Sequence, residues 1–310
     1  MNLRIKNQRG QAMVLTLVFM IVLLGMAAAV LDVGAWYRAH RGTQATADAS
    51  ALAGAQDLPD FPSSARTAAL DYAGRNGGGV QSQDVEFESG VVSNDTIKVT
   101  ARKSAAGVFT RLFGIDSVTA RSTAKARAGA MGDAKWAAPI GIDYRHQYLR
   151  CNAQLQCNPR FDEATEIDFT KVGPGAFRLI NIDGSYGGTS SDDIGEWISH
   201  GLDAYMPRNK WYYSDPGMKP NSSHVTRALD ERIGVGKEIL LPIYTQTRAQ
   251  GAGFEYYVVG WVGFRVSGYE INGAQNARIQ GQFTRVIWDG IQSEDGNEED
   301  FGARSVHLVE

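Results

Sequence analysis

The sequence is poor in the groups that carry out enzyme chemistry. Its five histidines are dispersed, and it contains neither a His-Glu-x-x-His zinc motif nor a Gly-x-Ser-x-Gly nucleophile motif. Gly234-Val235-Gly236-Lys237 is not a phosphate loop, because Glu231 replaces the first glycine and Glu238 follows the lysine. The net charge is −3 and no cluster of Lys and Arg has interleaved aromatics, so nucleic-acid binding has no support. We expect no enzyme, cofactor or metal, although spacing alone does not exclude a triad assembled in space.

Only one segment is apolar over the length that a membrane requires. Ala12 to Leu31 is an apolar run whose one polar side chain is Thr16. At 1.5 Å per helical residue it reaches about 30 Å, the hydrocarbon thickness of a bilayer. The long remainder of the chain has no second candidate, so the sequence predicts a single-pass membrane protein.

Charges flanking the run predict its orientation. No acid occurs among the first eleven residues, and the basic residues before the run are Arg4, Lys6 and Arg9. Positive flanks stay in the cytoplasm, so we expect residues 1–11 inside and the bulk of the chain beyond the membrane. Arg38 and Arg41 follow the run and weaken the asymmetry, while Asp32 partly offsets them.

Two kinds of processing are alternatives to a retained anchor. Ala27-Ala28-Ala29 supplies the small residues of a signal-peptide cleavage site, but the apolar run and the helical pattern both continue past it. Trp36 and Tyr37 then suit an interfacial anchor, which favours retention. Pilin-type cleavage after Gly10 requires Glu five residues later, where this chain has Leu15.

The sequence contains two cysteines, Cys151 and Cys157. No second pair of ligands has zinc spacing, and an exported domain lies in an oxidising compartment. We therefore predict a disulfide that closes a short loop and stabilises it by roughly 2 kcal/mol. Two free thiols are the alternative.

The apolar helix is expected to continue past the membrane to about Gln56, where Pro59 and Pro62 stop it and Gly42 offers a point of bending. Small residues recur four apart along it, which permits close approach of another helix. This predicts a helix-packing interface formed by Gly25, Ala29, Ala47, Ala51 and Ala55. The alternative is that alanine only favours helix and that the outer stripe packs on its own domain.

Residues 63–130 read as a small α+β module. A helix over 63–76 precedes two strands that alternate around Ser93-Asn94-Asp95; a short amphipathic helix is expected over 105–115, and a third strand over 117–128. The resulting α-β-β-α-β order predicts antiparallel strands with helices on one face.

Residues 134–310 predict a β-rich extracytoplasmic domain. Turn residues separate apolar strands at 177–182, 238–244, 256–271 and 277–288, and 303–310 adds a last strand. Two helices are expected, one with Ser191 as N-cap and one capped by Ser222 or Ser223 and closed by Gly234. The fold class is therefore α+β, with a long transmembrane helix, a small module and a β-rich domain.

Two segments of this domain have metal-site character but fit poorly. Asp183-Gly184-Ser185-Tyr186-Gly187 lacks the second hydroxyl that an adhesion-type metal loop requires, because Gly187 occupies that position. The acidic run from Glu294 to Asp300 lacks EF-hand spacing. A glycine-rich turn and a solvated loop are the simpler interpretations.

Several spaced motifs of the N-terminal third agree in order with one known family. They are Arg9-Gly10-Gln11 before the apolar run, Asp32-Val33-Gly34, Tyr37, Gln44-Ala45 and Ala47-Asp48-Ala49-Ser50-Ala51-Leu52-Ala53-Gly54-Ala55. Further matches are Val99-Thr100-Ala101, Phe109, Leu112-Phe113-Gly114-Ile115, Ala124 and Ala126. Residues 1–130 thereby resemble the TadE/TadG-like proteins of Flp (tight-adherence) pilus assembly, from which Ser50 is a small departure.

The resemblance implies a structural accessory of a pilus or secretion apparatus, anchored in the bacterial cytoplasmic (inner) membrane and without enzymatic activity. Implied partners are other pilus-assembly membrane proteins or pilin-like subunits, reached through the N-terminal helix, and a second copy of the chain. One alternative is a surface adhesin that displays aromatics such as Trp211, Tyr212, Tyr213, Tyr256 and Tyr257. A cell-wall hydrolase is less favoured, because it requires a catalytic cluster in a cleft.

Overall fold

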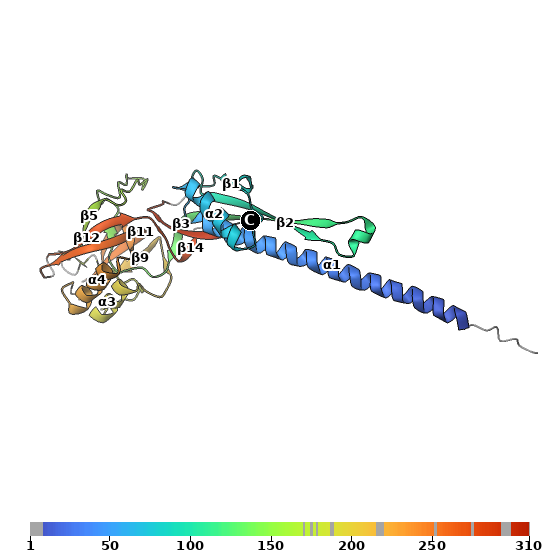
Figure 1. Ribbon diagram of the computed structural model, residues 1–310. Coiled ribbons are helices and arrows are strands. Elements are labelled where there is room, and N and C mark those ends of the chain that lie inside the picture. Colours follow the sequence, from blue (N-terminus) through green and yellow to red (C-terminus); the bar gives the residue numbers. More distant parts are fainter. Residues whose placement is uncertain are drawn as a thin grey trace, which may run out of the picture. The chain divides into compact units, whose positions relative to one another are not determined.

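The computed structural model describes residues 9–169, 171–173, 176–177, 179–186, 189–214, 220–250, 253–273, 276–292 and 299–309. It divides into two compact units with the boundary after Arg127; the last residues, from Leu308, group with the first unit. A long helix, several short helices and a β-rich C-terminal region confirm the predicted α+β class (Figure 1).

In the first unit, α1 (Arg9–Ala55) is one uninterrupted helix (Figure 1). Gly42 does not break it, and no atom lies within 4 Å of the point where a Cβ would stand. The helix ends before Pro59, and α2 (Pro62–Arg75) begins on a proline, which suits a first helical turn because its missing N–H would have no partner there. Ala65, Ala69 and Ala73 form the buried face of α2.

Three antiparallel strands complete this unit. The 3-10 turn η1 (Ser82–Asp84) leads into β1 (Val85–Glu88), which pairs with β2 (Thr96–Ala106). β2 pairs in turn with the first part of β3 (Ser117–Ala134). Ile97, Val99 and Ala101 of β2 are buried, and α1 packs on this strand.

Gly54 is the point of closest approach in this packing. A Cβ at this position would lie 2.5 Å from Ile97 Cδ1 and 2.9 Å from the carbonyl oxygen of Ala65. Glycine at the end of α1 therefore lets the helix contact α2 and β2 at the same time.

The amphipathic helix expected over 105–115 is wrong. β2 continues to Ala106, and only the 3-10 turn η2 (Thr110–Phe113) lies between β2 and β3. Gly107 donates its N–H to the carbonyl oxygen of Asp116 at 3.0 Å, which closes the hairpin before a helical turn can start. Gly114 then adopts a left-handed conformation that favours glycine and ends the turn.

The second unit contains a six-stranded sheet with the order β4-β10-β11-β12-β5, and β9 pairs with β11. β4 is parallel to β10, and the other pairs are antiparallel. α4 packs on β11 and α3 packs on α4. The elements are β4 (Ile142–Asp143), β5 (Ala164–Asp168), α3 (Ser191–Ser199), β9 (Lys210–Tyr213), α4 (Ser223–Val235), β10 (Ile239–Gln250), β11 (Gly253–Ile271) and β12 (Ala277–Thr284).

The remaining strands pair outside this sheet. β8 (Met206–Pro207) and β14 (Gly290–Gln292) each pair with the end of β3, β13 (Val286–Ile287) runs parallel to β15 (Ala303–Val309), and β6 (Lys171–Gly173) pairs with β7 (Ala176–Phe177). In β11, the register shifts beside Gly260, where a Cβ would collide with the ring of Phe301. The glycine therefore makes room for a buried aromatic.

Three local expectations for this unit differ from the structure. Within the expected strand 177–182, Leu179 and Ile180 make only isolated bridges, to Ile140 and Ser214. The N-cap of α3 is Ser190, whose Oγ accepts the N–H of Asp193. The left-handed residue that ends α4 is Gly236, two residues after the glycine expected to close it.

Candidate functional site

The N-terminal half of α1 exposes a continuous apolar surface. Every large apolar side chain from Met13 to Leu31 is exposed, and Leu15 and Phe19 are each 64 % accessible. The helix is long and apolar enough to cross a membrane. A surface of this size is unfavourable in water, so the structure supports burial of this segment in lipid.

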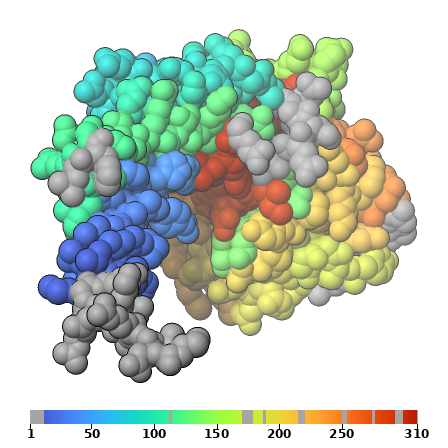
Figure 2. Space-filling model, turned by 90° about the vertical axis from the view of Figure 1, so that its right-hand side faces the viewer, coloured from blue at the N-terminus to red at the C-terminus, as the bar shows by residue number. Residues whose placement is uncertain are grey.

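The apolar run ends at Asp32, whose side chain is 1 % exposed. Its Oδ1 accepts the backbone N–H of Val108 at 3.0 Å, and its Oδ2 accepts those of Phe109 at 3.0 Å and Thr110 at 2.8 Å. One carboxylate thus satisfies three successive donors at the start of η2, as an N-cap residue does for a helix. Figure 2 shows the green β2–β3 segment against blue α1.

We call residues Gly107–Asp116 the hairpin tip. Its backbone is sharply folded: Ile115 donates its N–H to the carbonyl oxygen of Thr110, and a Cβ at Gly107 would collide with the Thr110 side chain. Val108 and Ile115 of the tip nevertheless face outward, being 67 % and 45 % exposed.

Beyond Asp32, polar side chains of α1 bind the rest of the unit. Thr43 Oγ1 and Ser122 Oγ are 2.8 Å apart, which joins α1 to β3, and both side chains are buried. Thr46 Oγ1 donates to the carbonyl oxygen of Asn76 at the end of α2, at 2.5 Å. These contacts hold the extramembrane half of α1 within its own module.

The predicted small-residue stripe divides into two parts. Ala47, Ala51 and Ala55 are each 0 % exposed. They lie on the part of α1 that packs on α2 and β2, which is the alternative that the sequence left open for the outer stripe. Gly25 and Ala29 are exposed, and no atom lies within 4 Å of a Cβ built at Gly25. Of the stripe, only this membrane part has a free surface for another helix.

The β1–β2 loop is organised by Asp95, which is 2 % exposed. Its carboxylate accepts the N–H groups of Gly90 and Val91 at 2.8 Å and of Val92 at 3.2 Å, and the hydroxyl of Thr96 at 2.8 Å. Burial acts to raise the pKa of Asp95, but these hydrogen bonds outweigh it and hold the pKa below the ordinary value of 3.8.

Cys151 and Cys157 are joined in the structure, with an S–S distance of 2.07 Å. Between them, Asn152 donates its N–H to the carbonyl oxygen of Gln156 at 3.0 Å. Both cysteines pack against the core of the second unit. The loop is therefore compact, and the disulfide itself stays a prediction that thiol chemistry can test.

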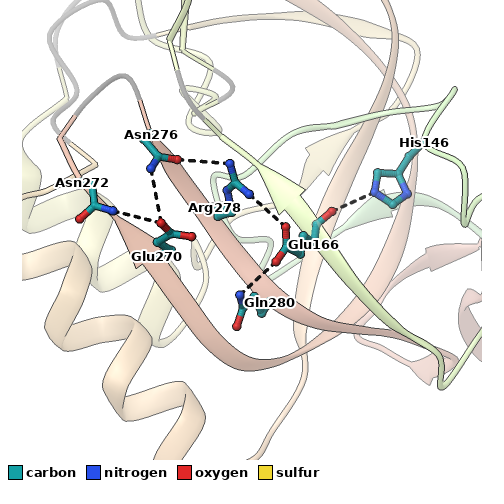
Figure 3. Close-up of polar contacts among 7 residues, drawn as sticks. All are labelled: His146, Glu166, Glu270, Asn272, Asn276, Arg278 and Gln280. Atoms are coloured by element: carbon teal, nitrogen blue, oxygen red, sulfur yellow. Dashed lines mark hydrogen bonds and ion pairs between the residues drawn. The ribbon is translucent and has the colours of Figure 1, made fainter.

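The second unit carries a polar cluster on its β5–β12 edge (Figure 3). Glu166 accepts hydrogen bonds from Arg278 Nη1 at 3.3 Å and from Gln280 Nε2 at 3.0 Å, and His146 Nε2 lies 3.1 Å from the Glu166 carbonyl oxygen. A hollow of about 460 Å³ lies beside Glu166 and Tyr148. Glu166 and Arg278 are about half exposed, and their charges neutralise each other, so the cluster is a surface ion-pair network.

Asp183 and Asp300, from the two segments with metal-site character, accept hydrogen bonds from nearby groups of the protein. Asp183 accepts the N–H of Ser185, as a turn residue does, while Gly187 lies outside the described residues. Asp300 accepts from Gly302 N at 2.8 Å and from Arg304 Nε at 2.6 Å; Glu294, Asp295 and Glu298 lie outside the described residues. In the described part of the chain, no three His, Cys, Asp or Glu side chains are grouped to hold a metal ion.

The aromatics considered for an adhesin contribute to packing. Tyr212 and Tyr256 are 1 % and 2 % exposed, and Trp211 and Tyr257 are half-buried and stack at 5.2 Å between ring centroids. Tyr213 is half-buried against Tyr186. They are therefore not displayed together as an open binding surface.

Comparison with known proteins finds neither a curated protein nor a solved structure that matches the chain. One family model does match. The residues that it matches are nearly those of α1, which carries the exposed apolar surface, Asp32 and the buried alanines. The family model described as putative Flp pilus-assembly TadE/G-like matches residues 10–57, and over this segment it confirms the resemblance read from the sequence.

Proposed function

We propose that this protein is a membrane-anchored structural component of a Flp/Tad-type pilus assembly or secretion apparatus, which acts through contacts with other proteins. The observation that carries the proposal is the family match over residues 10–57. That segment contains the apolar run and the buried residues that attach the small module to it. The match supports a pilus-related membrane component, and the structural role is our inference from it.

The proposed orientation has residues 1–11 in the cytoplasm, the span from residue 12 in the inner membrane, and the domains over 63–130 and 134–310 outside the cytoplasm. The basic residues before the span support this orientation. A disulfide between Cys151 and Cys157 agrees with an oxidising compartment. We propose no enzymatic activity and no cofactor.

Partners are proposed to bind the membrane half of α1. Gly25 and Ala29 lie four residues apart on one face, where small side chains let a second helix approach closely. The alanines farther along α1 are enclosed in their own unit, so they support the module rather than a partner. The partner is another pilus-assembly membrane protein, a pilin-like subunit or a second copy of this chain.

The test is crosslinking in intact membranes of cells that assemble the pilus, followed by identification of the proteins bound to the full chain. Replacing Gly25 and Ala29 by Leu should weaken capture of membrane-helix partners. The matched control is Ala27→Leu, which adds the same side chain to an exposed alanine about 200° around the helix from both positions.

Loss of capture in the double variant, with capture kept in the control, would support packing through this face. Equal capture by both variants would contradict the helix-packing interface. Recovery of no pilus-assembly protein at all, by a chain that is present in the membrane, would overturn the proposed function.

A further inference from the structure

We propose that the hairpin tip is a second membrane contact, and that its exposed apolar side chains enter the head-group layer of the bilayer that α1 crosses. The inference rests on the proposed membrane anchor and adds a lipid-binding surface outside residues 10–57. The partner that we propose for the hairpin tip is the lipid surface.

The tip contacts α1 at the point where the apolar run ends. The run from Ala12 to Leu31 spans about 30 Å as a helix, so Asp32 is the first residue at the hydrocarbon boundary. The tip is hydrogen-bonded to Asp32 at 2.8–3.0 Å, so its backbone lies at the same depth. The head-group layer extends about 5–7 Å beyond the hydrocarbon on each side, and the tip falls within it.

The tip is the end of the hairpin that lies beside the span. In Figure 1 the β2–β3 hairpin lies along α1 with η2 at the end nearer the N-terminus of the helix. The β1–β2 loop lies at the opposite end of β2, a strand of 11 residues, or about 35 Å at the rise of an extended chain. Only one end of this hairpin is therefore near the membrane.

The tip exposes apolar side chains. Val108 and Ile115 are exposed although they belong to a tightly folded turn, and Phe109 is 37 % exposed. Exposed apolar side chains are ordinary when single, but these gather on one turn that adjoins the end of the span. Tyr37, which is 58 % exposed, lies about 7–8 Å beyond Asp32 along α1, at the outer edge of the head-group layer, where tyrosine is enriched.

A contact with lipid also gives a role to the buried carboxylate of Asp32. A backbone donor without a partner becomes more costly as it approaches the hydrocarbon, where no water can bond it. Asp32 satisfies three of these donors at the tip from within the protein. The tip can therefore leave water with these N–H groups already bonded.

The experiment reconstitutes the full chain into phosphatidylethanolamine–phosphatidylglycerol vesicles that contain a phospholipid with a diazirine near its head group. After illumination, tryptic peptides are searched for lipid adducts. Residues 104–111 carry Val108 and Phe109 of the tip, residues 10–38 carry the span, and residues 76–98 carry the equally exposed Val91 and Val92 of the opposite loop.

The proposal expects adducts on the span peptide and on the tip peptide, with the tip several-fold above the opposite-loop peptide. Adducts on the span with the tip no higher than the opposite loop would overturn the lipid contact and leave the anchor standing. No adducts on the span would overturn the anchor and the tip contact together.

A variant pair provides the second readout. Val108→Asp places a charge on an exposed side chain at the tip, and Val91→Asp does the same on the opposite loop. The tip adducts should fall several-fold in the first variant and stay unchanged in the second. Because both positions are open to solvent, circular dichroism should show that both variants fold, and equal tip adducts in the two would contradict the proposal.

Discussion

The Oδ2 atom of Asp32 accepts the backbone N–H of Thr110 at 2.8 Å, across 78 positions of sequence. This contact joins the end of the apolar run of α1 to the far end of the β2–β3 hairpin, and Val108 and Phe109 donate their N–H groups to the same carboxylate. A charged group that is 1 % exposed at the end of a membrane span thus has a structural partner that explains its burial.

Asp32→Asn should release the hairpin tip. Asparagine offers one acceptor oxygen, and its amide N–H₂ would face at least one of the three backbone donors. Loss of charge-assisted hydrogen bonds costs about 1–3 kcal/mol, so the amides of Val108 to Thr110 should exchange roughly ten to a hundred times faster. Hydrogen exchange by mass spectrometry of the detergent-solubilised chain measures this.

The control for that variant is Asp116→Asn, whose carboxylate lies at the same tip but is 83 % exposed and 3.8 Å from Arg111. An exposed pair of this kind contributes little. Exchange that is equally fast in both variants, or unchanged in Asp32→Asn, would show that the cap does not hold the tip.

Gly54→Ala should destabilise the first unit although alanine is the better helix former. The added Cβ would stand 2.9 Å from the Ala65 carbonyl oxygen, which is backbone and cannot rotate away. We expect a loss of about 1–3 kcal/mol, as for other overpacked sites. Thermal unfolding of the solubilised chain, followed by circular dichroism, is the measurement.

Gly42→Ala on the same helix is the matched control, because nothing lies within 4 Å of its Cβ position. There the helix propensity of alanine should act alone and stabilise by about 0.5–1 kcal/mol. Opposite signs for the two variants are the expected result. A stabilising Gly54→Ala would mean that α1 does not contact α2 this closely.

The sequence was sufficient for features that depend on local period and composition. A run of apolar residues indicates the span and the long strands β10 and β11, and alternation of apolar and polar side chains indicates the first hairpin. Both patterns can be read from residues that are neighbours in sequence. Pairings between distant segments have no such signal. Asp32 is read from sequence as a charge beside a span, and nothing local indicates that residues 108–110 are its partners.

The helix expected over 105–115 is wrong for the same physical reason, because the competing contacts come from distant parts of the chain. Residues 105–115 have apolar side chains at helical spacing, which indicates a helix if hydrogen bonds can form within the segment. In the structure Ala105 and Ala106 pair with β3, and Asp32 takes the N–H groups that would begin the helix. Tertiary contacts thus decide between two local structures that the sequence favours similarly.

Acid should destabilise the β1–β2 loop through Asp95. Hydrogen bonds lower the folded-state pKa of this carboxyl below the 3.8 expected when unfolded. The unfolded state therefore binds a proton first as pH falls, so the stabilisation is complete above about pH 5 and is lost below pH 4 as pH falls through the folded pKa. Urea unfolding at pH 7 and at pH 3 measures this dependence.

Asp95→Asn should lower stability at pH 7 by about 1–2 kcal/mol and should reduce the loss between pH 7 and pH 3. Asp71→Asn is the control, because its half-exposed side chain pairs with Arg75 on the surface of α2. An Asp95→Asn chain with the same pH dependence as the original would exclude this loop as a source of acid sensitivity.

The Cys151–Cys157 bridge predicts a specific response to reduction. The two cysteines are six residues apart, so the loop they close is short and the bridge should stabilise the second unit by about 2 kcal/mol. The Cys151→Ser/Cys157→Ser double variant should therefore unfold at lower urea concentration than the oxidised chain, and at the same concentration as the reduced chain. Thiol titration of unfolded chain isolated from cell envelopes, without reductant, should find no free thiol. Two thiols per chain would contradict the disulfide and, with it, the argument that this domain faces an oxidising compartment.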